Sequence, residues 1–375
     1  MHVYVARAAA LAFFMLPLVW SGQAGATAVT GKPVVEVAFV LDSTGSMGAL
    51  IEGAKRKIWS IATAIVDANP DVEIRMGLVA YRDIGDEYVT KKFELTTDIQ
   101  DLYANLLELR ARGGGDWPES VNEALDVAVT KLSWTQGSEI CRIMFLVGDA
   151  PPHMDYAQDT KYPEVLRMAR ERGIVVNAVQ AGSARDTERV WRTIAQMGHG
   201  RYIPIPQGGG HLVVIKTPYD HEIIELQDEI NGTVIPYGPR RQRSDVEHKT
   251  KQAAAAPTPV ATEMAGSMSR NAARTSGEVI TGAGDLVADL KAGRQKLDAV
   301  KDDDLPDKLR NMPAAERQAF IDEQLAKRIA LNERMATLVK QRDGYALEQA
   351  KKSPSRPADS FDRAVADSLR AQVKR

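Results

Sequence analysis

The stretch VVEVAFVLDSTGS, residues 34–46, decides the fold of this chain. Residues 34–41 are rich in β-branched side chains and almost continuously apolar, which is typical of a strand buried on both faces of a parallel sheet. Asp42 then lies at the C-terminal end of the strand, the edge of an open α/β sheet where ligands bind. In extended chain Asp42, Thr44 and Ser46 point the same way, and Gly45 lets the loop turn inward. One carboxylate and two hydroxyls, without His or Cys, suit a hard cation such as Mg2+, Mn2+ or Ca2+.

Strand-like apolar runs alternate with segments of helical periodicity as far as about residue 205. We expect strands at Val34–Leu41, Glu73–Ala80, Tyr88–Leu95, Cys141–Val147, Ile174–Gln180 and Arg201–Ile205, and helices at Leu50–Asp67, Asp98–Arg110, Glu119–Leu132, Tyr162–Arg172 and Thr187–Met197. The polar, alternating stretch Tyr88–Leu95 is typical of an edge strand. This alternation predicts βαβ crossovers and a doubly wound, Rossmann-like α/β sheet covered by helices on both faces.

The first residues have the pattern of a secretory signal peptide, residues 1–26. An N-terminal segment with one Arg and no acid precedes the apolar run Ala8–Trp20, and Ala24-Gly25-Ala26 forms a small-x-small cleavage site. We expect cleavage after Ala26 or Ala28 and a periplasmic or secreted protein, with an uncleaved anchor as the alternative. The apolar run is short for a membrane span and no second one follows, so we expect no transmembrane span after cleavage.

Composition argues against several classes of protein. The 48 Lys+Arg nearly balance the 50 Asp+Glu, and no basic block is interleaved with aromatic residues, so we do not expect nucleic-acid binding. Cys141 is the only cysteine, which excludes an intrachain disulfide. Its position in an apolar run indicates a buried, unreactive thiol.

The C-terminal part of the chain has a different composition. We expect a flexible linker over residues 239–275, because its second half is rich in Ala, Pro, Thr and Ser, and then a helical region over residues 276–375. Helices are predicted at Ala314–Tyr345, whose apolar stripe is narrow and coiled-coil-like, and at the end of the chain, where apolar residues recur every four positions from Phe361 to Val373. These helices are expected to dock within the chain, with a partner protein as the alternative.

Two further loops carry acids that a cation at Asp42 would need. The glycine loop, residues 113–120 (GGGDWPES), contains Asp116, and the segment GDAPPH places Asp149 directly after the strand Cys141–Val147. If the first and fourth predicted strands are neighbours, Asp42 and Asp149 leave the same sheet edge side by side, and the glycine loop can bring Asp116 onto a third side. Taken singly, each acid also fits a turn or a helix cap.

Three other residues carry side chains that suit ligand or metal binding. Trp117 is a candidate for ligand contact on an exposed loop, with folding back into the core as the alternative. His153 and His199 lack neighbouring partners for metal ligation in the sequence, so we treat both as ordinary loop histidines.

The loop DSTGS resembles the D-x-[ST]-x-S signature of the von Willebrand factor A domain. The metal-ion-dependent adhesion site of that family also uses a Thr from a glycine-rich loop and an Asp that ends a later strand. The resemblance covers roughly residues 34–205 and implies a mostly parallel sheet with one antiparallel edge strand in a domain of residues 33–238. It assigns Asp42, Thr44 and Ser46 to the first motif and Asp149 to the strand-end position. The G-G-G-D-x-P-E-S version of the loop resembles a bacterial, secreted branch.

The chain departs from the family at the third position, where Asp116 stands in the place of the Thr. With three carboxylates the charge of a site holding a dication is −3 + 2 = −1, whereas a site with two carboxylates is neutral. Extra negative charge strengthens cation binding and weakens the recruitment of an acidic partner. Our hypothesis is a site that is more structural, or more selective for uncharged or water-bridged ligands, than one with Thr.

The resemblance implies a non-enzymatic, divalent-cation-dependent module that binds a protein or another ligand in the cell envelope. Mg2+ is the first choice of cation, with Ca2+ or Mn2+ as alternatives. A second reading is a scaffold that binds partners through its C-terminal helices. A metal-dependent phosphohydrolase is disfavoured, because Thr44 occupies the place of the second acid in haloacid-dehalogenase-like phosphatases, and the chain has no phosphate loop or nucleophile elbow. The identity of the partner does not follow from the sequence.

Overall fold

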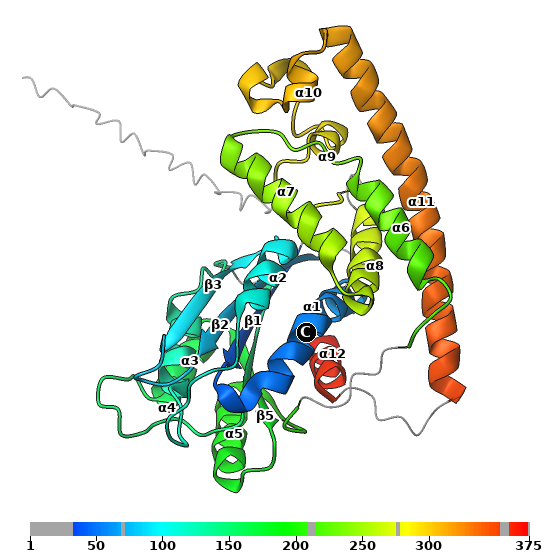
Figure 1. The fold of residues 1–375 in the computed structure, drawn as a ribbon. Coiled ribbons are helices and arrows are strands. Elements are labelled where there is room, and N and C mark those ends of the chain that lie inside the picture. Colours follow the sequence, from blue (N-terminus) through cyan, green and yellow to red (C-terminus); the bar gives the residue numbers. More distant parts are fainter. Residues whose placement is uncertain are drawn as a thin grey trace, which may run out of the picture. The chain divides into compact units, whose positions relative to one another are not determined.

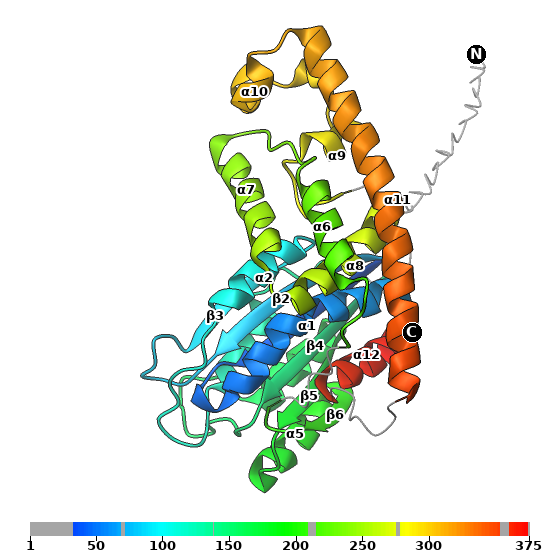
Figure 2. The ribbon, with the colours of Figure 1, turned by 45° about the vertical axis from the view of Figure 1, so that its right-hand side comes forward.

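The structure is a computed structural model that describes residues 33–68, 72–137, 139–208, 215–274, 278–352 and 360–373. The predicted signal peptide lies outside these residues. The structure contains a six-stranded sheet in the order β3-β2-β1-β4-β5-β6 (Figures 1 and 2). Its strands are β1 (Val34–Asp42), β2 (Glu73–Tyr81), β3 (Thr90–Thr96), β4 (Ile140–Gly148), β5 (Ile174–Ala181) and β6 (His199–Ile205).

The most apolar strand of the sequence lies in the middle of the sheet. β1 pairs in parallel with β2 on one side and with β4 on the other, and β5 and β6 continue the parallel arrangement. Only β3, at the edge beyond β2, runs antiparallel. The prediction of a mostly parallel, doubly wound sheet with one antiparallel edge strand is confirmed.

The alternation of side chains along β1 separates two apolar cores, one on each face of the sheet. Val35, Val37 and Leu41 face a core that contains residues of α1 (Gly48–Ala68) and α2 (Ile99–Glu108). Ala38 and Val40 face the other core. That second core is covered by α3 (Val121–Thr130), α4 (Tyr162–Glu171) and α5 (Arg185–Met197). Burial on both faces explains the nearly continuous apolar run of β1.

The segment 239–275, predicted to be a flexible linker, contains two helices instead. They are α7 (Arg240–Ala255) and α8 (Thr258–Arg274). The prediction gave too much weight to Ala and Pro as linker residues, although Ala is the strongest helix former and Pro257 and Pro259 lie at the start of α8, where proline is tolerated. Val260, Met264 and Met268 of α8 belong to the same apolar core as α1.

The remaining helices after the sheet pack mainly on one another. They are α6 (Asp220–Asn231), α9 (Leu286–Lys291), α10 (Asp307–Arg310) and the long α11 (Ala314–Lys352), which runs beside α6 (Figure 2). Residues of α6, α8 and α11 share an apolar cluster, and the buried Arg328 of α11 donates to Asp285 at 2.6 Å. α11 continues past the predicted end at Tyr345, because one glycine costs only about 1 kcal/mol within a helix and does not have to end it.

The last helix, α12 (Ser360–Gln372), returns to the central sheet. It lies beside α1 (Figure 2), and its Val365 and Leu369 are buried in the core on that face. The Gln372 side chain exchanges two hydrogen bonds with Asn177 of β5, at 2.8 and 3.0 Å. The end of the chain therefore completes one face of the sheet.

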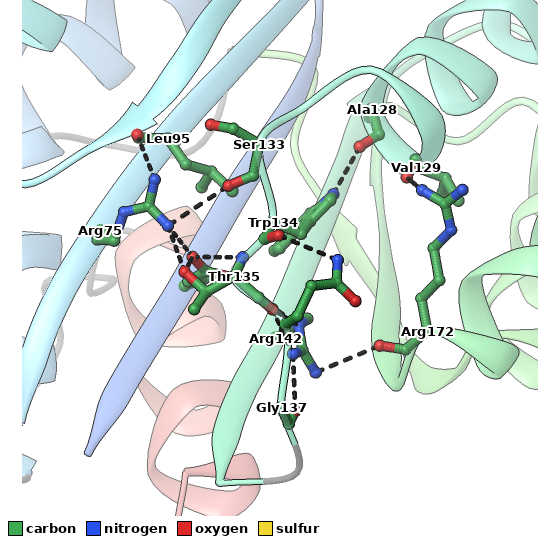
Figure 3. Close-up of polar contacts among 12 residues, drawn as sticks. Arg75, Leu95, Ala128, Val129, Ser133, Trp134, Thr135, Gly137, Arg142 and Arg172 are labelled. Carbon is green, nitrogen blue, oxygen red and sulfur yellow. Dashed lines mark hydrogen bonds and ion pairs between the residues drawn. The ribbon is translucent and has the colours of Figure 1, made fainter. Parts of the chain in front are cut away.

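A polar network holds the segment 133–137 against the sheet at the edge opposite the strand ends that carry Asp42 and Asp149 (Figure 3). Glu36 of β1 lies in register with Arg75 of β2 and Arg142 of β4, and it is fully buried. Thr135 donates to Glu36 from its hydroxyl at 2.7 Å, and Arg142 donates to the Gly137 carbonyl at 2.8 Å. The ion pair with Arg75 and the hydrogen bond from Thr135 satisfy the charge of Glu36, which would otherwise be costly to bury.

Candidate metal centre

Two neighbouring strands, β1 and β4, bring two of the predicted acids to one edge of the sheet. Asp42 is the last residue of β1 and lies in register with Tyr81, the last residue of β2. β4 ends at Gly148, and Asp149 follows it. A Cβ atom placed on Gly148 would lie 2.4 Å from Tyr81 Oη and 3.3 Å from Asp42 Oδ2. Glycine is required there because the three strand ends approach so closely.

The DSTGS loop arranges its polar groups around Asp42. Oδ1 of Asp42 accepts hydrogen bonds from the Thr44 amide at 2.8 Å and the Thr44 hydroxyl at 2.7 Å. The Thr44 hydroxyl is also 3.3 Å from Oγ of Ser46, an exposed residue. Oδ2 of Asp42 is buried and has no hydrogen-bond partner in the described part of the chain. The loop thus gathers the three side chains named from the sequence and leaves one carboxylate oxygen unpaired.

Asp149 is nearly as buried as Asp42 and lies close enough to influence it. Gln207 donates to Oδ2 of Asp149 at 2.5 Å, and the Thr187 hydroxyl donates to the Asp149 carbonyl at 2.9 Å. These contacts fix the backbone and one oxygen of Asp149. The structure therefore brings Asp149 and Asp42 together at the sheet edge.

The glycine loop presents a different acid to this site from the one named in the sequence analysis. Glu119 pairs with the segment after β4, donating from its amide to the Pro151 carbonyl at 2.9 Å and accepting from the His153 amide at 3.1 Å. Its Oε1 and the Cβ of Thr44 are the nearest atoms to a Cβ placed on Gly114, at 3.0 and 3.2 Å. Its Oε2 is buried without a hydrogen-bond partner among the described residues. Glu119 was missed because only the first of the two acids in GGGDWPES was considered.

The carboxylate of Asp116 lies beside His153, on the segment after β4. It is 61% exposed, and its Oδ2 is 3.5 Å from Nε2 of His153. It does not cap the following helix, because α3 begins at Val121 with Ser120 as its N-cap residue. Trp117 is 46% exposed and does not fold back into the core; its indole donates to Asp186 at 2.6 Å. A role for Trp117 in ligand contact stays a prediction.

The electrostatics of the site are unfavourable without a cation. Burial raises the pKa of Asp42 to about 7, against hydrogen bonds from Thr44 that lower it, and the charge of Asp149 adds to the rise. Burial, followed by the charges of Asp42 and Asp83, raises the pKa of Glu119 to about 9. Buried carboxylates that hold unpaired oxygens are the ligands that Mg2+ and Ca2+ take in proteins. The residues present therefore fit a hard divalent cation.

Comparison with known proteins assigns the sheet domain. A family model described as the von Willebrand factor A domain matches residues 36–216. Over 126 residues the chain is 32% identical to a protein of Acanthamoeba polyphaga mimivirus named as an ariadne-like RING finger protein, covering 32% of this chain and 12% of that one. Over 127 residues it is 28% identical to alpha-protein kinase vwkA of Dictyostelium discoideum, covering 34% and 20% respectively. The chain thus spans only a small part of the length of these relatives.

A solved structure, the SpRpn10 VWA domain, matches with a TM-score of 0.35 and 11% identity, covering 47% of this chain and 89% of that one. Within the described residues, no helix is long and apolar enough to cross a membrane. The family match covers β1 to β6, with the DSTGS loop and the acids at the sheet edge inside it. Residues 36–216 of this chain are a von Willebrand factor A domain, a protein-interaction module.

Proposed function

We propose that this domain holds one divalent cation, with Mg2+ as the first choice, and binds a protein partner through it. The ligand set is Asp42, Thr44, Ser46, Glu119 and Asp149. The observation that carries the proposal is the pair of unpaired, buried oxygens, Asp42 Oδ2 and Glu119 Oε2. A buried carboxylate is stable only when it is paired, protonated or bound to a metal. A dication between these side chains would stabilise their ionised forms.

In this ligand set Glu119 supplies the third carboxylate, the role that the sequence predicts for Asp116. With Asp42, Glu119 and Asp149 ionised around a dication, the site has a charge of −3 + 2 = −1. A negative site repels a carboxylate from a partner and favours an uncharged or water-bridged group. We therefore propose that the partner contributes a hydroxyl, an amide or a bridging water to the cation, in place of an acidic side chain.

The cell envelope is the proposed location, and the secretory pattern of residues 1–26 supports it. Mass spectrometry of the N-terminus after expression in the native host tests this. A mature chain that begins after Ala26 or Ala28 supports the proposal, whereas an intact N-terminus in the cytoplasmic fraction contradicts it.

We propose that binding is the role of this domain, with no catalytic step. The Thr44 side chain is hydrogen-bonded to Asp42, at the position where a phosphohydrolase of the type considered above requires a second acid. The relatives named as a kinase and a RING finger protein share only 20% and 12% of their lengths with this chain, so their names do not carry over. Phosphatase activity that is lost in Asp42→Asn would revive the catalytic alternative.

Thermal unfolding tests the cation site. The wild type is melted in EDTA and then with Mg2+, Ca2+ or Mn2+ separately, beside Asp42→Ala and the control Asp298→Ala, which changes an exposed acid far from the site in sequence. A cation that binds only the folded state raises the melting temperature. We expect a rise in the wild type and the control and no rise in Asp42→Ala. No rise with any of the cations would overturn the proposal.

Partner binding is tested separately from cation binding. The immobilised protein is exposed to a solubilised envelope fraction of its own host in Mg2+ and in EDTA, with Asp42→Ala in Mg2+ as the matched control. We expect a partner that is retained only by the wild type in Mg2+. Retention that is equal in all three conditions would point to the C-terminal helices, the scaffold alternative.

A further inference from the structure

A second group of metal-ligating side chains lies on the loops beside the proposed cation site. Asp83 follows β2, Asp116 lies on the glycine loop, and His153 lies on the segment after β4. One ligand atom from each residue lies within 4.8 Å of the other two. Nothing in the sequence brings these three residues together, so His153 was treated there as an ordinary loop histidine.

The imidazole of His153 points between the two carboxylates. Its side chain is only 7% exposed, and Nε2 lies 3.5 Å from Oδ2 of Asp83 and 3.5 Å from Oδ2 of Asp116. Nε2 is buried and makes no hydrogen bond to any described residue. On the other side of the ring, Nδ1 is 2.8 Å from Oδ1 of Asp155. In the neutral imidazole that a metal ion requires, this contact would hold the proton on Nδ1 and leave the lone pair of Nε2 facing the two acids.

The other two members of the cluster suit metal binding in different ways. Asp83 accepts a hydrogen bond from the Ser120 hydroxyl at 2.8 Å and another from the Tyr156 hydroxyl at 2.9 Å. The Tyr156 ring also stacks on the His153 ring, with centroids 3.9 Å apart. Outer contacts of this kind orient the ligands of metal sites. Asp116 is exposed, so one side of the cluster lies at the protein surface.

We propose that Asp83, Asp116 and His153 bind a transition-metal ion of the Zn2+ class. In a tetrahedral site with metal–ligand bonds of about 2.1 Å, neighbouring ligand atoms are about 3.4 Å apart. The two distances of 3.5 Å from Nε2 match that spacing. An imidazole nitrogen among the ligands favours Zn2+ over Mg2+ or Ca2+. Two carboxylates and a neutral imidazole give a charge of −2, which one dication neutralises.

This second ion would connect the loops that build the first site. Ser120, whose hydroxyl is bonded to Asp83, follows Glu119 directly in the chain. The charge of Asp83 also contributes to the raised pKa of Glu119. An ion at the second site would therefore fix the glycine loop in the position that presents Glu119 to Asp42. The proposal stands on the His153 cluster alone and does not depend on the first site.

Co2+ is the probe for the second site, because it substitutes for Zn2+ and absorbs strongly when its coordination is tetrahedral. The full chain is titrated with Co2+ in saturating Mg2+, which occupies the first site. We expect one equivalent of Co2+ to bind with visible absorption and Zn2+ to displace it. His153→Gln is expected to abolish the absorption, and Asp116→Asn to weaken binding at least tenfold. Asp155→Asn, which changes an outer contact, should weaken it about tenfold.

Two control variants keep the result interpretable. His221→Gln removes an exposed histidine on α6, and Asp42→Asn removes a ligand of the first site. Both are expected to retain the Co2+ absorption. Because Asp116 is exposed, Asp116→Asn should fold normally, as an unchanged melting temperature in EDTA would show. Absence of Co2+ absorption in the wild type would overturn the proposal, and so would Co2+ affinity that is unchanged in both His153→Gln and Asp116→Asn. Either result would mean that a protonated His153 bridges the two carboxylates.

Discussion

The Thr44 hydroxyl donates a hydrogen bond of 2.7 Å to Oδ1 of Asp42, and the Thr44 amide donates to the same oxygen at 2.8 Å. The other oxygen of this carboxylate is buried without a partner in the described chain. Thr44 therefore fixes the orientation of Asp42 and leaves a single oxygen for the proposed cation. Burying an unpaired carboxylate oxygen costs stability, and the proposed cation would offset that cost.

Thr44→Val should test this orienting role, because valine keeps the shape of the side chain and removes the hydroxyl. We expect the affinity for Mg2+ or Mn2+ to fall at least tenfold, which corresponds to about 1.4 kcal/mol. Isothermal titration calorimetry with each cation measures this affinity. Thr193→Val, which removes an exposed hydroxyl bonded to its own helix, is the matched control and should leave the affinity unchanged. Equal affinities for all three proteins would contradict a role for the Thr44 hydroxyl.

Asp42→Asn should have opposite effects with and without the cation. In EDTA above about pH 7, we expect the variant to be more stable than the wild type by roughly 1–3 kcal/mol, because it no longer buries a charge whose pKa is raised. With Mg2+ the wild type should gain stability and the variant should not. Urea unfolding measures the free energy of unfolding of the wild type and of the variant, each in EDTA and in Mg2+. A variant that is less stable than the wild type in EDTA would show that Asp42 is a structural acid.

A matched pair of carboxylate-to-amide substitutions tests whether Glu119 or Asp116 binds the cation. Glu119→Gln should reduce the rise in melting temperature with Mg2+ strongly, because it removes a carboxylate next to Asp42 and Thr44. Asp116→Asn should leave the rise intact, because that carboxylate lies against His153. The reverse result would restore the assignment made from the sequence, with Asp116 as the ligand.

Stability in EDTA should decrease as the pH rises from about 5 to about 8. The pKa values of Asp42 and Glu119 are raised in the folded state, to about 7 and about 9, from ordinary values of 3.8 and 4.5. In this range the unfolded chain has lost protons that the folded protein retains, so the free energy of unfolding falls with pH, by at most about 1.4 kcal/mol per pH unit for each group. Urea unfolding at several pH values measures the slope. Mg2+ should make the free energy of unfolding depend less on pH. In EDTA, a free energy of unfolding that rises with pH or does not change with pH would contradict the raised pKa values.

The sheet and the edge that carries Asp42 and Asp149 were predictable because their signals are local. The apolar run that ends at Asp42 indicates a central parallel strand, and Asp149 follows a second run of the same kind. Their convergence depends only on β1 and β4 being neighbours, which the doubly wound pattern favours.

The rest of the site depends on loop conformation, which carries no periodic signal. Glu119 pairs with the segment at Pro152, its side chain lies near Thr44, and no pattern in GGGDWPES indicates this placement. The cluster at His153 joins residues from three loops that are far apart in the sequence. The helices over residues 239–275 were missed for a different reason. A segment rich in Ala and Pro is typical of a linker, and the sequence does not show that residues of α8 pack in the same apolar core as α1.

The position of α12 predicts that its buried side chains stabilise the sheet. Leu369 and Val365 are buried in the core beside α1, so residues 360–373 belong structurally to the sheet although the family match ends at residue 216. Leu369→Ala should lower the free energy of unfolding by roughly 2–5 kcal/mol, the usual cost of emptying a buried leucine site. The neighbouring Arg370→Ala, which changes an exposed side chain, should cost less than about 0.5 kcal/mol.

The same reasoning applies to a chain cut near residue 237, which is the direct way to ask whether the C-terminal helices bind the partner. Such a cut removes α12 and α8 from the core on the α1 face. Loss of partner binding would then reflect a damaged sheet as readily as a lost binding surface. Point variants on the exposed side of α11, such as Leu347→Ser, leave that core intact and test the helices directly. If the cut chain unfolds with the same melting temperature as the full chain, α12 does not support the sheet and this argument fails.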